Sequence, residues 1–150
     1  MRIRRATLED MAACAVLHRL TMRVSLSYLP ELHTPDDDRW WFREQLFPAN
    51  TVWLAEADDA ALAGYAAVAP GWLTHLYVHP EHQGAGVGPA LLAQAMADAD
   101  ELQLWTFQRN ARARAFYEKR GFELVELTDG AGNEEREPDC LYRWRRITND

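Results

Sequence analysis

The sequence predicts an α/β protein built on one mixed β-sheet with helices on both faces. Two apolar segments, 51–57 and 62–69, are separated by an Asp-rich turn and predict a β-hairpin. From residue 72 onward, expected strands alternate with expected helices, and the chain then closes on two strands. Hairpin-linked strands pair antiparallel, whereas strands joined through a helix usually pair parallel, so the combination predicts a mixed sheet.

Composition limits the classes of function. At 150 residues the chain is expected to form a single domain, residues 1–150, and it contains no internal repeat or linker. The net charge of −7 argues against a nucleic-acid partner. No apolar stretch approaches the ~20 residues of a membrane span. Met1 to Arg5 lead into polar residues, and Cys14 and Cys140 lie far apart without metal-ligand spacing, so we expect a cytoplasmic protein with two buried thiols and no metal.

The first half of the chain begins with an expected strand at 3–6. A helix over 7–27 follows, with Thr7 as its cap and Leu8, Met11, Ala12 and Ala15 at helical spacing. A second helix starts at Thr34-Pro35 and is expected to stop at Pro48. Its tryptophans, Trp40 and Trp41, are interpreted as core residues, with the lining of an acceptor pocket as the alternative.

The second half supplies the remaining strands, at 72–78, 102–107, 122–127 and 141–146. A helix between the first two carries Leu92, Ala95 and Met96 on one face. Another helix, 110–120, ends before Gly121, which suits the C′ position. Seven strands and about four helices are therefore expected.

The stretch with the strongest functional signal joins the strand at 72–78 to the following helix. After the turn His79-Pro80-Glu81, glycines alternate at Gly84, Gly86 and Gly88. Glycine allows positive φ and a close approach of the backbone to a ligand, and the first N–H groups of a helix lack internal partners at the positive end of the dipole. This stretch therefore predicts an anion site suited to phosphate.

The spacing of the glycines decides between known phosphate loops. Pro89 follows Gly88, where a P-loop needs Lys and Ser or Thr, and the G-x-G-x-G spacing with a preceding turn does not fit the dinucleotide fingerprint. The pattern Gln83-x-x-Gly86-x-Gly88 after a strand instead resembles the acetyl-CoA motif of the GNAT superfamily of N-acetyltransferases. The resemblance implies a GNAT-like fold and acetyl-CoA as co-substrate, with the pyrophosphate on backbone amides. It assigns cofactor binding to Leu76, Tyr77, Val78, Gln83, Gly84, Ala85, Gly86, Val87, Gly88 and Pro89.

A second motif lies in the helix 110–120. Asn110, Ala113 and Tyr117 recur at i, i+3 and i+7, on one face of that helix. Taken alone, Asn110 is a plain helix cap and Tyr117 a core aromatic residue. The order Asn-x-x-Ala-x-x-Phe-Tyr-x-x-x-Gly-Phe again resembles the GNAT pattern, in which the Asn helps to bind CoA and the Tyr lies near the thioester sulfur. Asn110, Ala113 and Phe116 are therefore assigned to cofactor binding and Tyr117 to catalysis.

The implied chemistry is direct attack of a primary amine on the thioester. A phenol, with a pKa of about 10, can protonate a leaving thiolate whose pKa is about 8.5, which is the expected role of Tyr117. The amine must also lose a proton, and some family members place a carboxylate where this chain has Trp105. His75 is the expected substitute base, with a structural histidine as the equally weighted alternative; Glu56 and His33 are weaker candidates. A bulge near Leu76 and a gap between strands 72–78 and 102–107 are expected to admit the thioester.

Alternatives remain for the function and for the acceptor. One is a CoA-sensing domain that binds acetyl-CoA without turnover, and another is a dinucleotide-binding module. The acceptor is an amine on a small molecule or peptide, and homodimerisation is an expectation from the family alone. The acidic residues 36–38 with Asp129, Glu134, Glu135, Glu137 and Asp139 favour a cationic acceptor or are simply solvated. The basic residues Arg109, Arg112, Arg114, Lys119 and Arg120 form a solvated face or supply one or two contacts to the CoA phosphates.

Overall fold

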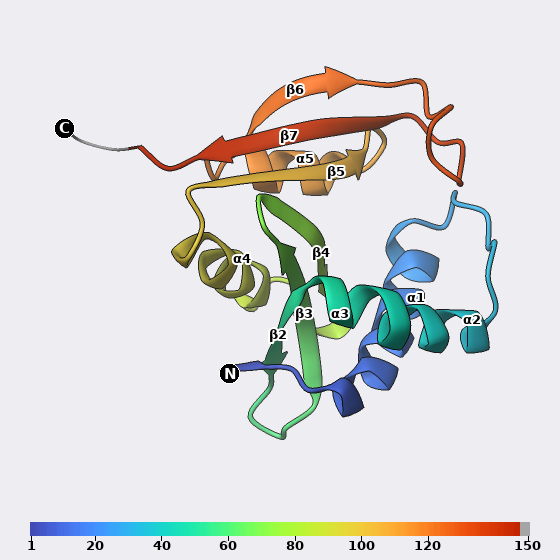
Figure 1. Ribbon diagram of the computed structural model, residues 1–150, viewed down its shortest axis with the longest axis vertical. Coiled ribbons are helices and arrows are strands. Elements are labelled where there is room, and N and C mark those ends of the chain that lie inside the picture. The colour runs from blue at the N-terminus through green and yellow to red at the C-terminus, as the bar shows by residue number, and fades with distance from the viewer. Residues whose placement is uncertain (148–150) are drawn as a thin grey trace. The chain divides into compact units, whose positions relative to one another are not determined.

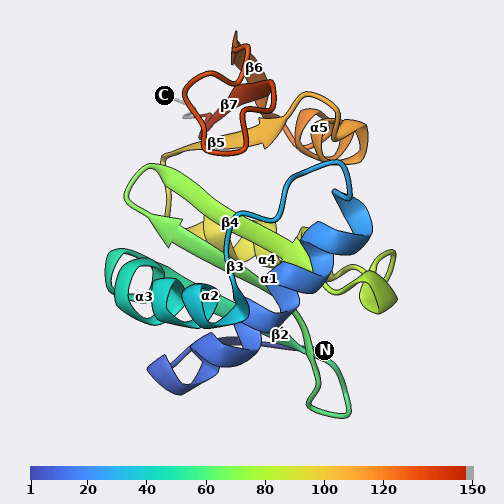
Figure 2. The same ribbon diagram turned by 90° about the vertical axis from the view of Figure 1, so that its right-hand side faces the viewer.

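The computed structural model describes residues 1–147, which form two compact units. The first unit comprises Met1–Ala69 and Leu73–Asp98, and the second comprises Pro70–Trp72 and the chain from Ala99 onward. Figure 1 and Figure 2 show the elements of both units from two directions. None of the helices within residues 1–147 has the length and apolar character needed to cross a bilayer.

The secondary structure follows the predicted order. The strands are β1 (Arg2–Arg5), β2 (Thr51–Glu56), β3 (Leu62–Ala69), β4 (Trp72–Val78), β5 (Glu101–Phe107), β6 (Glu123–Leu127) and β7 (Asp139–Arg145). The α-helices are α1 (Met11–Ser25), α2 (Pro35–Trp41), α3 (Phe47–Ala49), α4 (Val87–Ala97) and α5 (Ala111–Glu118). Short turns of other helix types are η1 (Leu8–Asp10), the π-helical turn η2 (Phe42–Leu46) and η3 (Pro80–His82).

The strands form a mixed sheet, as predicted. Hydrogen bonds order its seven strands β1-β2-β3-β4-β5-β7-β6. The pairs β1–β2, β2–β3, β5–β7 and β6–β7 are antiparallel. The pair β4–β5 is parallel, with Trp72 opposite Gln103. The mixed sheet with its helices confirms the fold class.

Successive residues of β3 show that helices cover both faces of the sheet in the first unit. Tyr65 is fully buried in the core cluster formed with α1 and η2. A Cβ built on its neighbour Gly64 would lie 3.1 Å from side-chain atoms of Val87 and Leu91, both on α4. Because consecutive strand residues point to opposite faces, α1 and α4 lie on opposite sides of β3. Figure 2 shows this arrangement, with α1 in front of the strands and α4 behind them.

The first helix differs in detail from its prediction. The chain forms the turn η1 before α1 starts at Met11, and the Asp10 carboxylate accepts hydrogen bonds from the Thr7 N–H at 2.7 Å and from Arg4 at 2.9 Å. Leu8 is 48% exposed, and Ala12 is also exposed, so the expected apolar face was wrong at these two residues. The buried face of α1 consists of Met11, Cys14, Ala15, Leu17 and Thr21.

The second helical segment begins as predicted and ends slightly later. Thr34 Oγ1 accepts a hydrogen bond from the Asp37 N–H at 3.1 Å, and the Asp37 carboxylate accepts one from the Thr34 N–H at 3.0 Å, with Pro35 next in the chain. Pro48 does not stop the segment, because it lies in the first turn of α3, where a missing N–H is tolerated. Asn50 ends it by donating to the carbonyl of Leu46 at 2.8 Å.

In the second unit, α5 has a defined start and end. Asn110 Oδ1 accepts a hydrogen bond from the Ala113 N–H at 3.1 Å, which confirms the predicted cap. At the other end Gly121 has φ of 92°, and the Phe122 N–H returns to the carbonyl of Tyr117 at 3.1 Å. On its outer side Arg114 Nε donates to the Tyr142 hydroxyl at 2.9 Å, and that hydroxyl donates to Glu118 at 2.7 Å. These bonds fix α5 against β7.

Candidate active site

The glycine loop has the backbone conformation that its sequence predicts. Gly84 and Gly86 have φ of 81° and 83°, and Gly86 forms the N-cap of α4. A Cβ built on either residue would meet no protein atom within 4 Å. The left-handed backbone conformation favours glycine at both positions. The space beside the loop is open to a ligand.

The strand before the loop and the helix after it hold the loop in place. The His79 N–H donates to the carbonyl of Ala63 on β3 at 2.8 Å, and His79 Nδ1 accepts from the Glu81 N–H at 3.1 Å. Gln83 Nε2 donates to the carbonyl of Val78 at 3.4 Å, which closes the turn back onto β4. After the loop, Val87 is buried. The loop is thus tied to the sheet on both sides.

The first turn of α4 offers backbone donors. The first hydrogen bond of the helix runs from the Ala90 N–H to the carbonyl of Gly86 at 3.1 Å. The N–H groups of Val87 and Gly88 precede it and have no partner within an ideal helix, and Pro89 has no N–H. These two donors sit at the positive end of the helix dipole, which favours an anion.

Gly64 helps to position the first turn of α4, and the sequence analysis did not identify it. A Cβ at this position would lie 2.8 Å from the carbonyl oxygen of Tyr77 and 3.1 Å from both Val87 and Leu91. The absence of a side chain lets α4 pack directly on β3. A lone glycine within a strand pattern is the sequence signal for such a close approach.

His75 lies in an aromatic cluster in the first unit. Its Nδ1 is 2.9 Å from the Tyr65 hydroxyl, and its ring stacks on that of His18 with centroids 5.1 Å apart. The Trp41 ring stacks at 5.6 Å, and Tyr77 meets His75 edge-on at 5.2 Å. Trp41 packs on this partly buried histidine, but its own side chain is 39% exposed and that of Trp40 is 52% exposed, so the interpretation of both as core residues was wrong. The cluster gives His75 a structural role independent of any catalytic one.

Burial changes the ionisation of this cluster. It lowers the pKa of His75 well below the usual 6.5, and the neighbouring His18 lowers it further. Burial also lowers the pKa of His18 to about 4, against a weaker opposing effect of Asp38. The pKa of the Tyr65 hydroxyl is raised, mainly by burial. At neutral pH both imidazoles are therefore uncharged, and each can accept one hydrogen bond.

The other proposed bases lie elsewhere in the first unit. Glu56 accepts a hydrogen bond from Arg4 Nε at 3.0 Å. The carbonyl of His33 accepts from Arg19 at 2.7 Å, in an exposed loop. Neither residue belongs to the aromatic cluster around His75.

The predicted catalytic tyrosine lies in the second unit, on α5. Tyr117 is 8% exposed, and its ring meets Phe116 at 5.1 Å and Phe122 at 5.4 Å. Arg120 places its guanidinium 4.0 Å from the centre of the Phe116 ring and donates to the Phe116 carbonyl at 3.0 Å. Aromatic neighbours therefore hold the Tyr117 ring in one place within this unit.

Basic residues around α5 take part in the packing of the second unit. Arg114 donates to Tyr142, Arg120 covers Phe116, and Arg109 forms an ion pair with Glu137. Arg112 and Lys119 are exposed. That one or two of these five residues contact the CoA phosphates stays a prediction.

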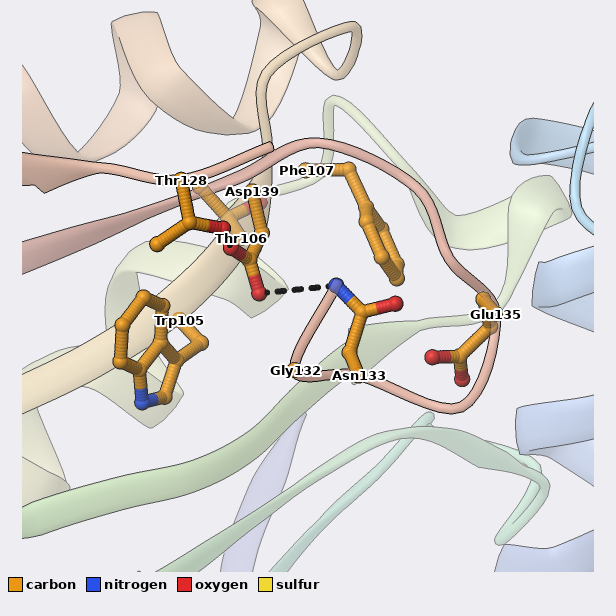
Figure 3. A pocket seen from close by; sticks show the side chains of 8 residues that line it. All are labelled: Trp105, Thr106, Phe107, Thr128, Gly132, Asn133, Glu135 and Asp139. Atoms are coloured by element: carbon orange, nitrogen blue, oxygen red, sulfur yellow. Dashed lines mark hydrogen bonds between the residues drawn. The ribbon is translucent and has the colours of Figure 1, made fainter. Parts of the chain in front are cut away.

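The second unit also contains a pocket that the sequence did not predict. It has a volume of about 490 Å³ and lies between β5 and the loop that joins β6 to β7. Trp105, at the place where some family members carry a carboxylate, lines it and is 47% exposed. Figure 3 shows the side chains around it.

Comparison with known proteins places the chain in a family. The family model described as "Acetyltransferase (GNAT) domain" matches residues 48–124. An uncharacterized N-acetyltransferase of Escherichia coli, YafP, is 31% identical over 117 residues, covering 75% of this chain and 73% of that protein. The peptidyl-lysine N-acetyltransferase YiaC of the same organism is 31% identical over 97 residues, covering 63% of this chain and 62% of that protein.

Other matches fix the fold and the extent of the similarity. Uncharacterized mycobacterial N-acetyltransferases are 32% identical, and the chain spans about 60% of their length. The structure of yncA from Salmonella typhimurium with its cofactor acetyl-CoA superposes with a TM-score of 0.74 at 19% identity, covering 100% of this chain and 98% of that one. The mixed sheet, the glycine loop before α4 and the family match over half of the sequence lead to one conclusion: this chain belongs to the GNAT acetyltransferase family.

Proposed function

We propose that this chain is an acetyl-CoA-dependent N-acetyltransferase, acting as a single domain over residues 1–150, that transfers the acetyl group to a primary amine. The observation that carries the proposal is the pair of left-handed glycines, Gly84 and Gly86, beside open space at the start of α4. In a member of this family, such a loop is suited to the pyrophosphate of CoA. The acetyl-CoA bound by the Salmonella relative and the peptidyl-lysine activity named for YiaC support a thioester donor and an amine acceptor.

In the proposed reaction the amine nitrogen attacks the thioester carbonyl carbon, and the carbon–sulfur bond then breaks. The electron pair leaves with sulfur, and the Tyr117 hydroxyl donates its proton to the thiolate to give CoA thiol. The attacking nitrogen loses a proton to His75, and solvent returns protons to the phenolate and removes them from the imidazole. No covalent enzyme intermediate is required, because holding the two substrates in line supplies much of the rate.

The ionisation of His75 has consequences for its proposed role as base. Its lowered pKa keeps the imidazole neutral at pH 7, so that it is always able to accept a proton. The same shift makes it a weak base for an alkylammonium, whose pKa is about 10.4. We therefore propose that His75 takes the proton as the nitrogen–carbon bond forms, when the nitrogen becomes much more acidic.

Thermal unfolding with and without acetyl-CoA tests the loop assignment. A ligand that binds only the native state raises the melting temperature by mass action, so acetyl-CoA should stabilise the wild type. Gly86→Val should remove this shift by placing a side chain in the open space beside the loop. Gly71→Val is the matched control, because Gly71 has a similar φ of 77° and equally open surroundings but lies in the β3–β4 turn.

The two variants carry comparable backbone strain, so they separate strain from ligand contact. Gly71→Val should unfold at a lower temperature yet keep its acetyl-CoA shift. An undiminished shift in Gly86→Val, or an equal loss in both variants, would remove the support that the loop gives to the proposal.

A further inference from the structure

The pocket in the second unit combines acidic and aromatic lining residues. Two of its lining residues are acidic, Glu135 and Asp139, and two are aromatic, Trp105 and Phe107. Its other lining side chains, among the residues that the structure describes, are neutral. The volume of about 490 Å³ is in the range of small-molecule sites. A group that enters this pocket therefore meets negative charge and aromatic surface together.

Asp139 is the fixed acid of the pocket. Its side chain accepts hydrogen bonds from the Thr128 hydroxyl and, at 3.1 Å, from Asn133 Nδ2. Figure 3 shows the bond to Asn133 as a dashed line. Both partners are neutral, and within residues 1–147 no basic side chain forms an ion pair with Asp139.

Glu135 is the available acid. It is partly buried, and within residues 1–147 it forms no hydrogen bond or ion pair. In Figure 3 its carboxylate and the Trp105 ring lie on opposite sides of the pocket. A cation between them could pair with the carboxylate and lie against an aromatic face.

Four other acids of the predicted rim have structural partners. Glu137 forms an ion pair with Arg109. Asp36 pairs with Arg39, Asp37 caps α2, and Asp38 pairs with Arg19 at 2.6 Å. Among the acids of the predicted rim, Glu135 and Asp139 are the two that line the pocket.

The loop that forms the pocket is held by specific contacts. Gln108 Nε2 donates to the carbonyls of Thr128 and Asp139 at 2.8 and 3.0 Å, which joins the two ends of the loop. Asn133 donates to the Glu137 carbonyl at 2.8 Å and accepts from its N–H at 3.2 Å. Gly130 has φ of 83°, and a Cβ there would lie 2.8 Å from Pro138 N. Such preorganisation reduces the entropy lost on binding.

We propose that this pocket binds a cationic group of the acceptor, an organic ammonium or guanidinium, and so selects amines that carry a second positive charge. This inference rests on the proposed acetyl transfer. Glu135 supplies the pairing charge, and Trp105 with Phe107 supplies the aromatic surface. Monoamines of the same length lack the second charged group that the pocket recognises, so they should be poorer acceptors.

Two matched ligand pairs test the proposal. For turnover, 1,5-diaminopentane is compared with pentylamine, which differs by the second amine. For binding without chemistry at nitrogen, choline is compared by calorimetry with its neutral isostere 3,3-dimethylbutanol. Glu135→Gln removes the pairing charge, and Glu134→Gln is the control, because it makes the same change of charge at an exposed neighbour outside the pocket lining.

The wild type should favour the diamine over pentylamine in kcat/KM and bind choline more tightly than 3,3-dimethylbutanol, each by about tenfold, the size expected for one charge-assisted contact. Glu135→Gln should lose both preferences, and Glu134→Gln should keep them. Equal use of the two amines, or preferences unchanged in Glu135→Gln, would overturn the proposal. Glu135-dependent binding of choline without acetyl transfer to either amine would contradict the proposed function and support the pocket as a cation site.

Discussion

The rings of His18 on α1 and His75 on β4 stack with their centroids 5.1 Å apart and their planes 7° from parallel. Phe42 and Tyr77 meet the His18 ring at 5.5 and 4.8 Å, and the Tyr65 hydroxyl bonds to His75. Two imidazoles can pack together in this aromatic cluster as long as neither carries a charge. Protonation of either would place a charge where little water can solvate it.

Stability should therefore fall in mildly acidic solution. The pKa of His18 is about 4 in the folded protein, and that of His75 is also well below 6.5, whereas both are expected near 6.5 in the unfolded chain. Above pH 6.5 neither state takes up a proton, so the full stability is present. As the pH falls from 6.5 toward 4, the unfolded state binds protons first, and each histidine costs up to about 1.4 kcal/mol per pH unit.

Urea unfolding at pH 7.5, 5.5 and 4.5 measures this effect. His18→Gln should flatten the dependence, and His33→Gln, in an exposed loop, should leave it unchanged. The carboxylate of Asp10 does not interfere, because its pKa is lowered to about 2, so the stability it contributes is present throughout this range and is lost only below about pH 4. A wild-type stability that stays constant from pH 7.5 to 4.5 would show that these histidines are not held neutral by the fold.

Tyr117→Phe should lower kcat by about 10²- to 10³-fold, as expected for loss of a general acid, with acetyl-CoA affinity nearly unchanged. The phenyl ring can keep the contacts to Phe116 and Phe122, so any change in melting temperature reports the lost hydroxyl rather than lost ring packing. Steady-state kinetics and a thermal scan of the same preparation separate the two effects. Near-normal turnover in the variant would leave Tyr117 with a packing role alone.

Gly64→Ala should reduce the free energy of unfolding by about 1–3 kcal/mol, because the added methyl group overpacks the contact between β3 and α4. It should also weaken the acetyl-CoA thermal shift, since the first turn of α4 would have to move. Gly132→Ala is the control, because a Cβ there would meet no atom within 4 Å. Equal stability of both variants would mean that α4 does not depend on Gly64 for its position.

Both thiols should react slowly in the native protein. Burial raises the pKa of Cys14 to about 12, and it also raises that of Cys140, whose Sγ donates to the Thr106 carbonyl at 3.3 Å. Since the thiolate is the reactive form, alkylation by iodoacetamide at pH 8 should be at least about 10²-fold slower than in urea. Intact-mass spectrometry counts the added groups, and rapid double labelling without urea would contradict the burial of these residues.

Much of this fold could be predicted from local sequence signals. Pro35 after Thr34 marked the start of α2, and Gly121 marked the end of α5, because caps depend on a few adjacent residues. The register of α1 was harder to predict. Its first buried residue is set by the turn η1 and by the ion pair of Arg4 with Asp10, a contact between a strand and the following turn.

The candidate site, too, could be predicted only in part from local sequence signals. The spacing of Gly84 and Gly86 predicted their left-handed conformation. The role of Gly64 could not be predicted, because it depends on the packing of α4 against β3. The sequence showed that this loop is acidic, but it did not show which acids form ion pairs and which line a pocket. Only the three-dimensional contacts show that Glu137 is paired with Arg109 while Glu135 lines a pocket.

The most direct test of the proposed function follows both products of the reaction. The protein is incubated with acetyl-CoA and a panel of primary amines, and CoA thiol and acetylated amine are measured together by mass spectrometry. Acetyl transfer predicts that both products form in equal amounts, and that Tyr117→Phe slows both equally. Stabilisation by acetyl-CoA without release of CoA thiol above the rate of spontaneous hydrolysis, for every amine in the panel, would contradict the account and indicate a domain that binds acetyl-CoA without turning it over.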